Sequence, residues 1–241
     1  MPDRRRHRGP HPEDEMLFAR SKWPDIQMAT SHLSWLLSRD YAITSAVKLV
    51  GDRFGLDARQ RIAVQRSACS DGALERRAGH QARSKDLAGS QVDIDGFNIL
   101  TTVEAGLAGG VLLRGRDGCL RDMASMHGSY RRVEETVPAL EIIGETLEPL
   151  RPSGCTWWLD RPVSNSGRLS ELIQEVASRR DWPWRTQLSP DPDPHLSGSS
   201  HMVITADSVI LDRTSSWFNL AALIFLHGDL SAWVVPVGGG D

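Results

Sequence analysis

From residue 91 to the end of the chain, short apolar segments alternate with segments of helical periodicity. Strands are predicted at 92–95, 111–114, 155–160, 184–188, 202–206 and 233–237, and helices at 101–108, 132–149, 166–180 and 217–227. Alternation of this kind is typical of a mainly parallel sheet with helices on both faces. The predicted fold class is therefore α/β over this part of the chain.

The segment before residue 91 carries only helical patterns. Helices are predicted at about 25–38, 42–54 and 57–66, with Gly55 as the stop signal of the second and Asp57 as the N-cap of the third. A short glycine turn before an Arg/Gln-rich helix also has the outline of a helix-turn-helix. Its nucleic-acid contacts would be Arg59, Gln60, Arg61 and Arg66, and the alternative is a solvated helix face.

The charge balance changes between the two parts of the chain. Residues 1–90 carry 16 Lys+Arg and 11 Asp+Glu, whereas residues 91–241 carry 12 and 20. This asymmetry suggests two modules. The predicted organisation is a disordered tail at 1–12, a small all-α domain at 13–78, a polar linker at 79–90 and an α/β domain at 91–241.

Three apolar strands of the α/β part end in an aspartate, at Asp95, Asp160 and Asp207, and Asp212 follows the last by five residues. The carboxyl ends of parallel strands meet at one edge of a sheet, so these side chains are expected to converge. Carboxylates brought together repel one another unless a cation lies between them. Oxygen ligands suit Mg²⁺ or Mn²⁺, which can activate water for phosphodiester cleavage.

Each acid also has an ordinary structural interpretation. Asp95 could be a turn residue beside Gly96, and Asp207 could cap the helix that follows it. Asp160 could pair with Arg161 or Arg168, and Asp212 could pair with Arg213 or lie in solvent. Glu104 fits a capping box that starts at Thr101 better than a metal site.

Further polar residues are candidates for substrate binding. Asn98 lies one turn after Asp95, where it could orient a phosphate. A compact basic loop with Arg114 and Arg116 could hold a backbone phosphate, and a simple turn is the alternative. The polar run after Asp160 leads into a helix N-terminus, which is a natural phosphate site, and contributes Arg161, Ser164, Asn165 and Ser166.

The motifs Asp-Gly-Phe-Asn at 95–98, Leu-Asp-Arg at 159–161 and Thr-Ala-Asp-Ser at 205–208 resemble those of PIN-like nuclease domains of the NYN branch. The resemblance covers roughly residues 91–238. It implies an α/β/α sandwich and Mg²⁺- or Mn²⁺-dependent cleavage of RNA or DNA. From about Arg8 onward the chain also resembles an uncharacterised prokaryotic family that joins a helical N-terminal domain to such a domain, and that family carries no known activity.

Two alternatives remain open at this point. Asp93 and Asp95 have the Asp-x-Asp form of haloacid-dehalogenase-type phosphatases, but no lysine follows Lys85 to neutralise a phospho-aspartate. If both aspartates face the crevice, a phosphatase is favoured, and if Asp95 alone does so, a nuclease. The second alternative is a catalytically inactive nucleic-acid-binding module with scattered acids.

The remaining features concern the cellular compartment. The three cysteines, Cys69, Cys119 and Cys155, are far apart and show no disulfide framework or zinc-ligand spacing. The longest apolar run has seven residues, from Leu220 to Leu226, which is too short to span a membrane. The expectation is a cytoplasmic protein that contacts nucleic acid and no membrane.

Overall fold

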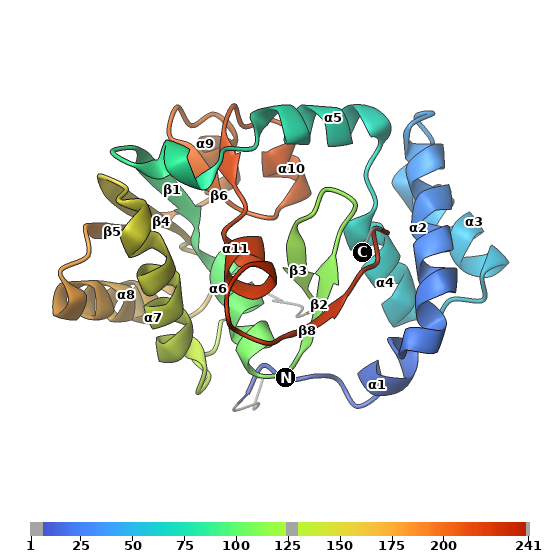
Figure 1. Ribbon diagram of the computed structural model, residues 1–241, viewed down its shortest axis with the longest axis horizontal. Coiled ribbons are helices and arrows are strands. Elements are labelled where there is room, and N and C mark those ends of the chain that lie inside the picture. Colours follow the sequence, from blue (N-terminus) through green and yellow to red (C-terminus); the bar gives the residue numbers. More distant parts are fainter. Residues whose placement is uncertain (1–6, 124–129, 240–241) are drawn as a thin grey trace.

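The computed structural model describes residues 7–123 and 130–239. The N-terminal region is helical, as predicted, and Figure 1 shows it at the opposite end of the molecule from α8. Its elements are α1 (Asp14–Leu17), the 3₁₀ turn η1 (Arg20–Lys22), α2 (Trp23–Leu37), α3 (Ile43–Arg53), α4 (Ala58–Ser67) and α5 (Asp71–His80). Asp57 caps α4 and Gly55 adopts a positive φ after α3, so the predicted N-cap and the predicted helix stop are both confirmed.

A five-stranded sheet forms the centre of the α/β part. Its strands are β1 (Gln91–Asp95), β4 (Gly154–Asp160), β5 (Trp184–Ser189), β6 (Met202–Ile204) and β7 (Trp217–Phe218). They lie in the order β5-β4-β1-β6-β7, and every pair is parallel. Counted along the chain within this sheet, the order is 3-2-1-4-5. The prediction of a mainly parallel sheet is confirmed.

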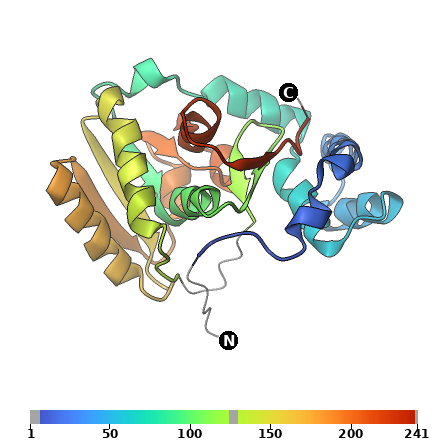
Figure 2. The same cartoon turned by 60° about the horizontal axis from the view of Figure 1, so that its bottom comes forward.

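Helices cover both faces of this sheet, because its strands carry apolar side chains on both sides. On one face, β1, β4 and β6 share a core with α6 (Gly96–Leu107), α7 (Thr136–Leu147), α8 (Ser166–Arg180) and α11 (Leu220–Leu226). On the other face, Val203 and Trp158 pack with α9 (Asp193–Ser197) and α10 (Ser208–Leu211). Figure 2 shows α7 and α8 together on their side of the sheet.

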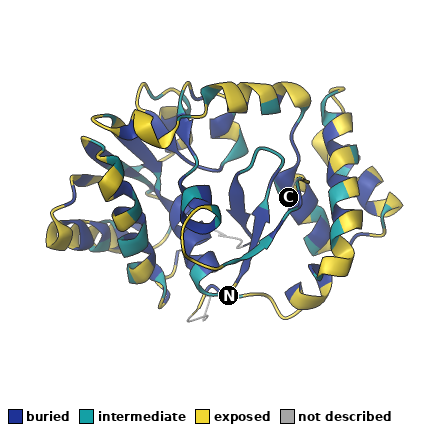
Figure 3. Ribbon diagram, in the orientation of Figure 1, coloured by how far each residue is buried: buried dark blue, intermediate teal, exposed yellow. Residues whose placement is uncertain are grey.

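A second, three-stranded sheet joins the α/β part to the helical region. It consists of β3 (Leu120–Asp122), β2 (Val111–Arg114) and β8 (Trp233–Val235), with β2 antiparallel to β3 and parallel to β8. Val111, Leu113 and Val235 share one hydrophobic core with α2, α3 and α4. In Figure 3 this contact is buried, whereas the outward faces of α2 and α3 are exposed.

Several element predictions need correction. Helix α6 begins at Gly96, directly after β1, so Thr101 and Glu104 lie inside it and form no capping box. Residues 217–227 were predicted as one helix, but Trp217 and Phe218 form strand β7 and pair with β6. Helix α11 follows, with Asn219 as its N-cap. Strand β3 was not predicted, since its three residues carry no readable alternation.

The tail and the linker are also more ordered than predicted. Residues 1–6 of the expected tail lie outside the described residues. The Arg8 side chain is buried and pairs with the buried Glu104, so the tail is anchored at this residue, whereas residues 10–12 are exposed. The expected linker at 79–90 contains the end of α5 and the 3₁₀ turn η2 (Ser84–Leu87), and Ala82 N–H donates to Trp217 O at 2.8 Å. Within the described residues, no helix is long and apolar enough to cross a membrane.

Candidate functional site

The strand order places a topological switch point between β1 and β6. The chain leaves β1 towards β4 and β5 and later returns to the other side of β1 as β6. Helices that follow β1 and β6 lie on opposite faces, so a crevice opens at the carboxyl ends of these two strands, where ligands bind in open α/β sheets. Asp95 ends β1, and Asp207 follows β6 after two residues.

Asp95 is half-buried at the carboxyl end of β1. The Thr205 hydroxyl donates to its Oδ2 at 2.7 Å. The pKa of Asp95 is raised to about 7, mainly by burial and also by the negative charges of Asp207 and Asp193, against the hydrogen bond from Thr205. A carboxyl group with such a pKa exchanges its proton near neutral pH, which is common at functional sites.

Asp207 serves both the crevice and the backbone. Its Oδ1 accepts from the N–H groups of Val209 at 2.7 Å and Ile210 at 3.3 Å, so it caps α10 as the ordinary interpretation required. Asn98 does not point free into the crevice, because its Oδ1 accepts from Ala206 N–H at 2.8 Å. Asn98 therefore fixes the loop that carries Asp207.

Two further carboxylates come from the loop after β5. Burial raises the pKa of Asp193, and the charges of Asp207, Asp191 and Asp160 act in the same direction. Burial also raises the pKa of Asp160, at the end of β4, with a contribution from Asp191. Asp193 is thus within electrostatic reach of Asp95, Asp160 and Asp207, and Asp95 is within reach of Asp207. We refer to Asp95, Asp160, Asp193 and Asp207 as the acidic crevice.

Sequence reasoning missed Asp191 and Asp193. The run Ser-Pro-Asp-Pro-Asp-Pro at 189–194 looks like a polar loop and no more. It directly follows β5, however, so the same rule that selected Asp160 applies to it: polar residues just beyond a parallel strand lie at the crevice edge. Pro192 is the N-cap of α9, which begins at Asp193, and Pro194 lies in the first turn of this helix.

No described lysine or arginine forms an ion pair with any of the four acids of the crevice. The expected partners of Asp160 are elsewhere: Arg161 donates to Leu188 O at 3.1 Å, and Arg168 has no carboxylate partner among the described residues. As the side chains stand, no group of three or more described His, Cys, Asp or Glu residues is close enough to hold a metal ion. A cation would have to draw the carboxylates together.

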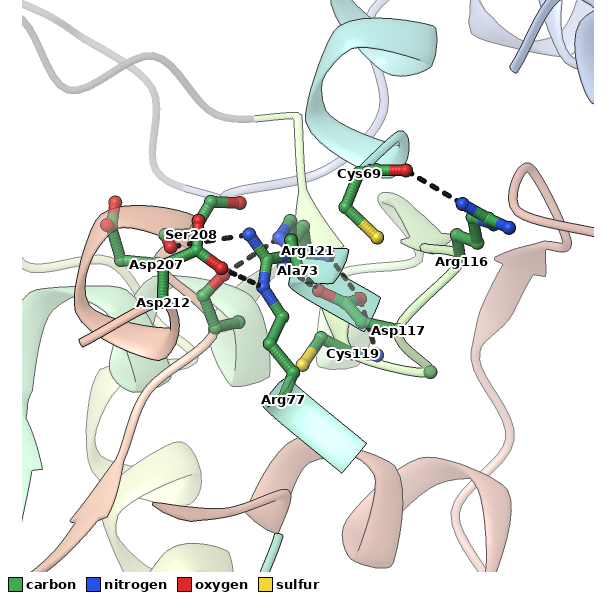
Figure 4. A network of polar contacts seen from close by, with 12 residues as sticks. Cys69, Ala73, Arg77, Arg116, Asp117, Cys119, Arg121, Asp207, Ser208 and Asp212 are labelled. Carbon is green, nitrogen blue, oxygen red and sulfur yellow. Dashed lines mark hydrogen bonds and ion pairs between the residues drawn. The ribbon is translucent and has the colours of Figure 1, made fainter. Parts of the chain in front are cut away.

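Asp212 was predicted as a fourth metal ligand, and in the structure its carboxylate is engaged by an arginine. Its Oδ1 accepts from Arg77 Nε at 2.7 Å, and Arg77 also pairs with Asp117 at 2.6 Å. Asp117 is bound in addition by Arg121. Figure 4 shows this chain of ion pairs, which connects α5, the β2–β3 turn and α10. The charge of the Asp212 carboxylate is therefore neutralised by Arg77 of α5. The sequence analysis did not predict this helix.

The basic loop with Arg114 and Arg116 does not belong to the crevice. Arg116 donates to Cys69 O at 2.9 Å and pairs with Asp71, so it ties the β2–β3 turn to the start of α5. Arg114 ends β2 and lines a separate cavity of about 580 Å³ between α5, the same turn and α11. Neither arginine is placed for a substrate that lies at Asp95.

The polar residues after Asp160 shape their own loop. Ser166 Oγ donates to Asp160 O and to Val163 O, each at 2.5 Å, and Asn165 Nδ2 donates to Tyr130 O at 2.9 Å. Ser164 contributes its carbonyl, which accepts from Tyr130 N–H at 3.2 Å. These hydrogen bonds hold the β4–α8 loop against the segment before α7. The side chains of Asn165 and Ser166, which were predicted to contact a phosphate, are used for these bonds within the protein.

Asp93, the first aspartate of the Asp-x-Asp sequence, lies among hydrogen-bond donors. It is 1% exposed, and its carboxylate accepts from Trp158 Nε1 at 3.0 Å, Ser199 Oγ at 2.6 Å and His201 Nδ1 at 3.2 Å. It is enclosed by these donors and does not face the crevice. Of the two aspartates, only Asp95 lies at the carboxyl end of β1.

Comparison with known proteins adds family membership. A family model described as Domain of unknown function (DUF5616) matches residues 84–223, which is more than half of the chain. The chain belongs to this family. A second model, described as Protein of unknown function (DUF434), matches residues 25–79. The DUF5616 match begins at η2 and contains the whole acidic crevice, and the DUF434 match lies within the helical region.

The chain also resembles an uncharacterised protein of Methanocaldococcus jannaschii. The two are 27% identical over 186 residues, which cover 77% of this chain and 88% of the relative. The match therefore extends beyond either family model alone. No solved structure matches the chain.

Proposed function

We propose that the protein is a metal-dependent nuclease with a PIN-like α/β domain that hydrolyses phosphodiester bonds of RNA or DNA. The observation that carries the proposal is the acidic crevice: four carboxylates from four strand ends, at the switch point of a parallel sheet, without an arginine or lysine partner among the described residues. The strand order 3-2-1-4-5 and the helices on both faces support the fold assignment.

The donor set fits Mg²⁺ or Mn²⁺. These ions take carboxylate oxygens and water, and Asp95, Asp160, Asp193 and Asp207 are the residues that would hold them. Burial and the neighbouring carboxylates raise the pKa of Asp95, and a cation bound there would favour its ionised form. Such an ion supplies a water molecule of lowered pKa and neutralises charge on the phosphate.

The remaining residues act on geometry and protonation. Thr205 holds Asp95 in place through its hydroxyl, and Asn98 holds the loop of Asp207. Asp207 Oδ1 is committed to the start of α10, so only Oδ2 can serve a ligand. Asp95, which exchanges its proton near pH 7 in the protein alone, must lose that proton when a cation binds. Cation binding is therefore expected to tighten as pH rises through 7.

The test is cleavage of 5′-labelled single-stranded RNA and DNA with Mn²⁺, Mg²⁺ or EDTA, comparing wild type with Asp95→Asn and Asp193→Asn. We expect cleavage by wild type with either ion and at least a hundredfold loss in both variants, as is common when charge stabilisation in the transition state is removed. Asp181→Asn, an exposed change at the end of α8, is the matched control. Equal cleavage by wild type and Asp95→Asn would disprove the proposal, and no cleavage by any of them would favour an inactive binding module.

A further inference from the structure

A groove of about 320 Å³ lies between the segment 130–132 and the first two turns of α8. Its walls are tied together, because Tyr130 N–H donates to Ser164 O and Asn165 Nδ2 donates to Tyr130 O. The Tyr130 hydroxyl anchors this wall from behind through a 2.6 Å hydrogen bond to Glu104. The groove is therefore a supported feature of the fold, and we call it the arginine groove.

The charged residues that line the groove are all arginines: Arg131, Arg132 and Arg168. Among the residues that the structure describes, no acidic side chain lines it. All three side chains belong to exposed residues, and neither Arg132 nor Arg168 forms an ion pair within the described part of the chain. An arginine guanidinium presents a planar fork of donors that matches a phosphate, so three of them around one groove favour a phosphate-bearing ligand.

The groove lies next to the acidic crevice. Only the loop 161–165 separates Asp160 from α8, and Ser166 Oγ at the start of the helix donates to Asp160 O. The crevice itself repels phosphates, because its four carboxylates have no protein cation. A polyanion that reaches the crevice must be held by positive charge beside it, and the arginine groove is where the chain provides that charge on the Asp160 side.

We propose that the arginine groove binds the phosphodiester backbone of a single nucleic-acid strand and guides that strand to the acidic crevice. The proposal rests on the proposed nuclease function for its biological meaning, and it rests on Arg131, Arg132 and Arg168 for its chemistry. Contacts to the backbone carry no base information, so binding is insensitive to base sequence and strongly dependent on salt.

The experiment measures binding without cleavage. Fluorescence anisotropy of a 5′-fluorescein 12-mer of oligouridylate is recorded in EDTA at 50 to 200 mM KCl, a range in which phosphate contacts are strongly weakened. The variant is Arg132→Glu/Arg168→Glu. The control is Arg179→Glu/Arg185→Glu, which makes the same charge change at exposed positions on α8 and β5. Circular dichroism checks that both variants are folded.

We expect the slope of log K against log salt to be smaller by about 1.4 in the groove variant, about 0.7 for each lost phosphate contact on a single strand. Its affinity should fall about tenfold or more, and that of the control by much less. Equal losses in both variants, or no binding by wild type at 50 mM KCl, would overturn the proposal.

This outcome is separable from that of the nuclease test. If wild type binds with the expected slope but does not cleave with Mn²⁺, the groove proposal stands and the nuclease proposal is refuted. If wild type cleaves, and Arg132→Glu/Arg168→Glu shows unchanged binding and unchanged KM, the groove proposal is refuted and the nuclease proposal stands.

Discussion

Asp117→Asn is the substitution whose effect can be worked out most directly from the structure. The Asp117 side chain is 2% exposed and accepts from Arg77 Nη1 at 2.6 Å, Arg121 Nη1 at 2.9 Å and Arg121 Nη2 at 2.7 Å. Arg77 and Arg121 are themselves 4% and 5% exposed. Asparagine keeps the shape but removes the charge, and the amide can accept through one oxygen only.

The expected cost is large because two buried guanidinium groups lose their shared counter-charge. Arg77 keeps Asp212, whereas Arg121 keeps only the carbonyl of Ala206. Breaking a buried ion pair by removal of one partner costs about 3–5 kcal/mol. For a chain of this size about 2–4 °C of Tm correspond to each kcal/mol, so thermal unfolding followed by circular dichroism should show a fall of roughly 6–20 °C.

Asp71→Asn is the matched control. Its partner Arg116 lies on the same β2–β3 turn, but the Asp71 side chain is 63% exposed. Solvent screens such a pair, so its loss should leave Tm nearly unchanged. A Tm of Asp117→Asn within 2 °C of wild type, roughly what a change below 1 kcal/mol produces, would show that the network in Figure 4 contributes little and would refute the reasoning.

The same network predicts a pH dependence. Burial alone would raise the pKa of Asp117, but the charges and hydrogen bonds of Arg121 and Arg77 outweigh it and hold this pKa well below its usual range. A carboxyl whose folded-state pKa is depressed adds stability above its unfolded pKa, which is about 3.9, and that stability is lost as pH falls further. The Tm difference between wild type and Asp117→Asn should therefore be constant above about pH 5 and shrink below about pH 4.

Two further predictions concern the acidic crevice. In the absence of divalent cations and above about pH 7, Asp95→Asn should be more stable than wild type. Because the folded-state pKa of Asp95 is raised to about 7, the free energy of unfolding of wild type should fall as pH rises from about 4 to 7 and should stay at the lower value above pH 7. Urea unfolding at pH 5 and pH 8 measures this, and an equal difference at both values would contradict it. Gly96→Ala should cost about 1–3 kcal/mol, because its Cβ would lie 2.6 Å from Leu159 Cδ2 and 2.8 Å from the backbone oxygen of Trp158. Gly167→Ala, where nothing lies within 4 Å, is its control, and equal stability of the two variants would show that β4 can move away.

The acidic crevice was only partly predictable. Asp95, Asp160 and Asp207 were identified because each follows an apolar strand, and the parallel sheet does bring these strand ends to one edge. Asp193 has the same relation to β5 but stands in a proline-rich run that carries no periodicity of its own. Asp212 fits the spacing of a ligand equally well, yet it is five residues beyond β6 and is bound by Arg77 from a distant helix.

What the sequence determined by itself is the local structure: the α/β alternation, the helices of the N-terminal region and the strand ends that carry acids. Hydrophobic periodicity reports these because it reflects which face of each element is buried. Only the tertiary structure decided which charges meet. Arg8 neutralises Glu104 across 96 residues and Arg77 neutralises Asp212 across 135, and neither pairing leaves a local trace. The acids of the crevice stand out only after these pairs are known, because a carboxylate without a partner is defined by the whole fold.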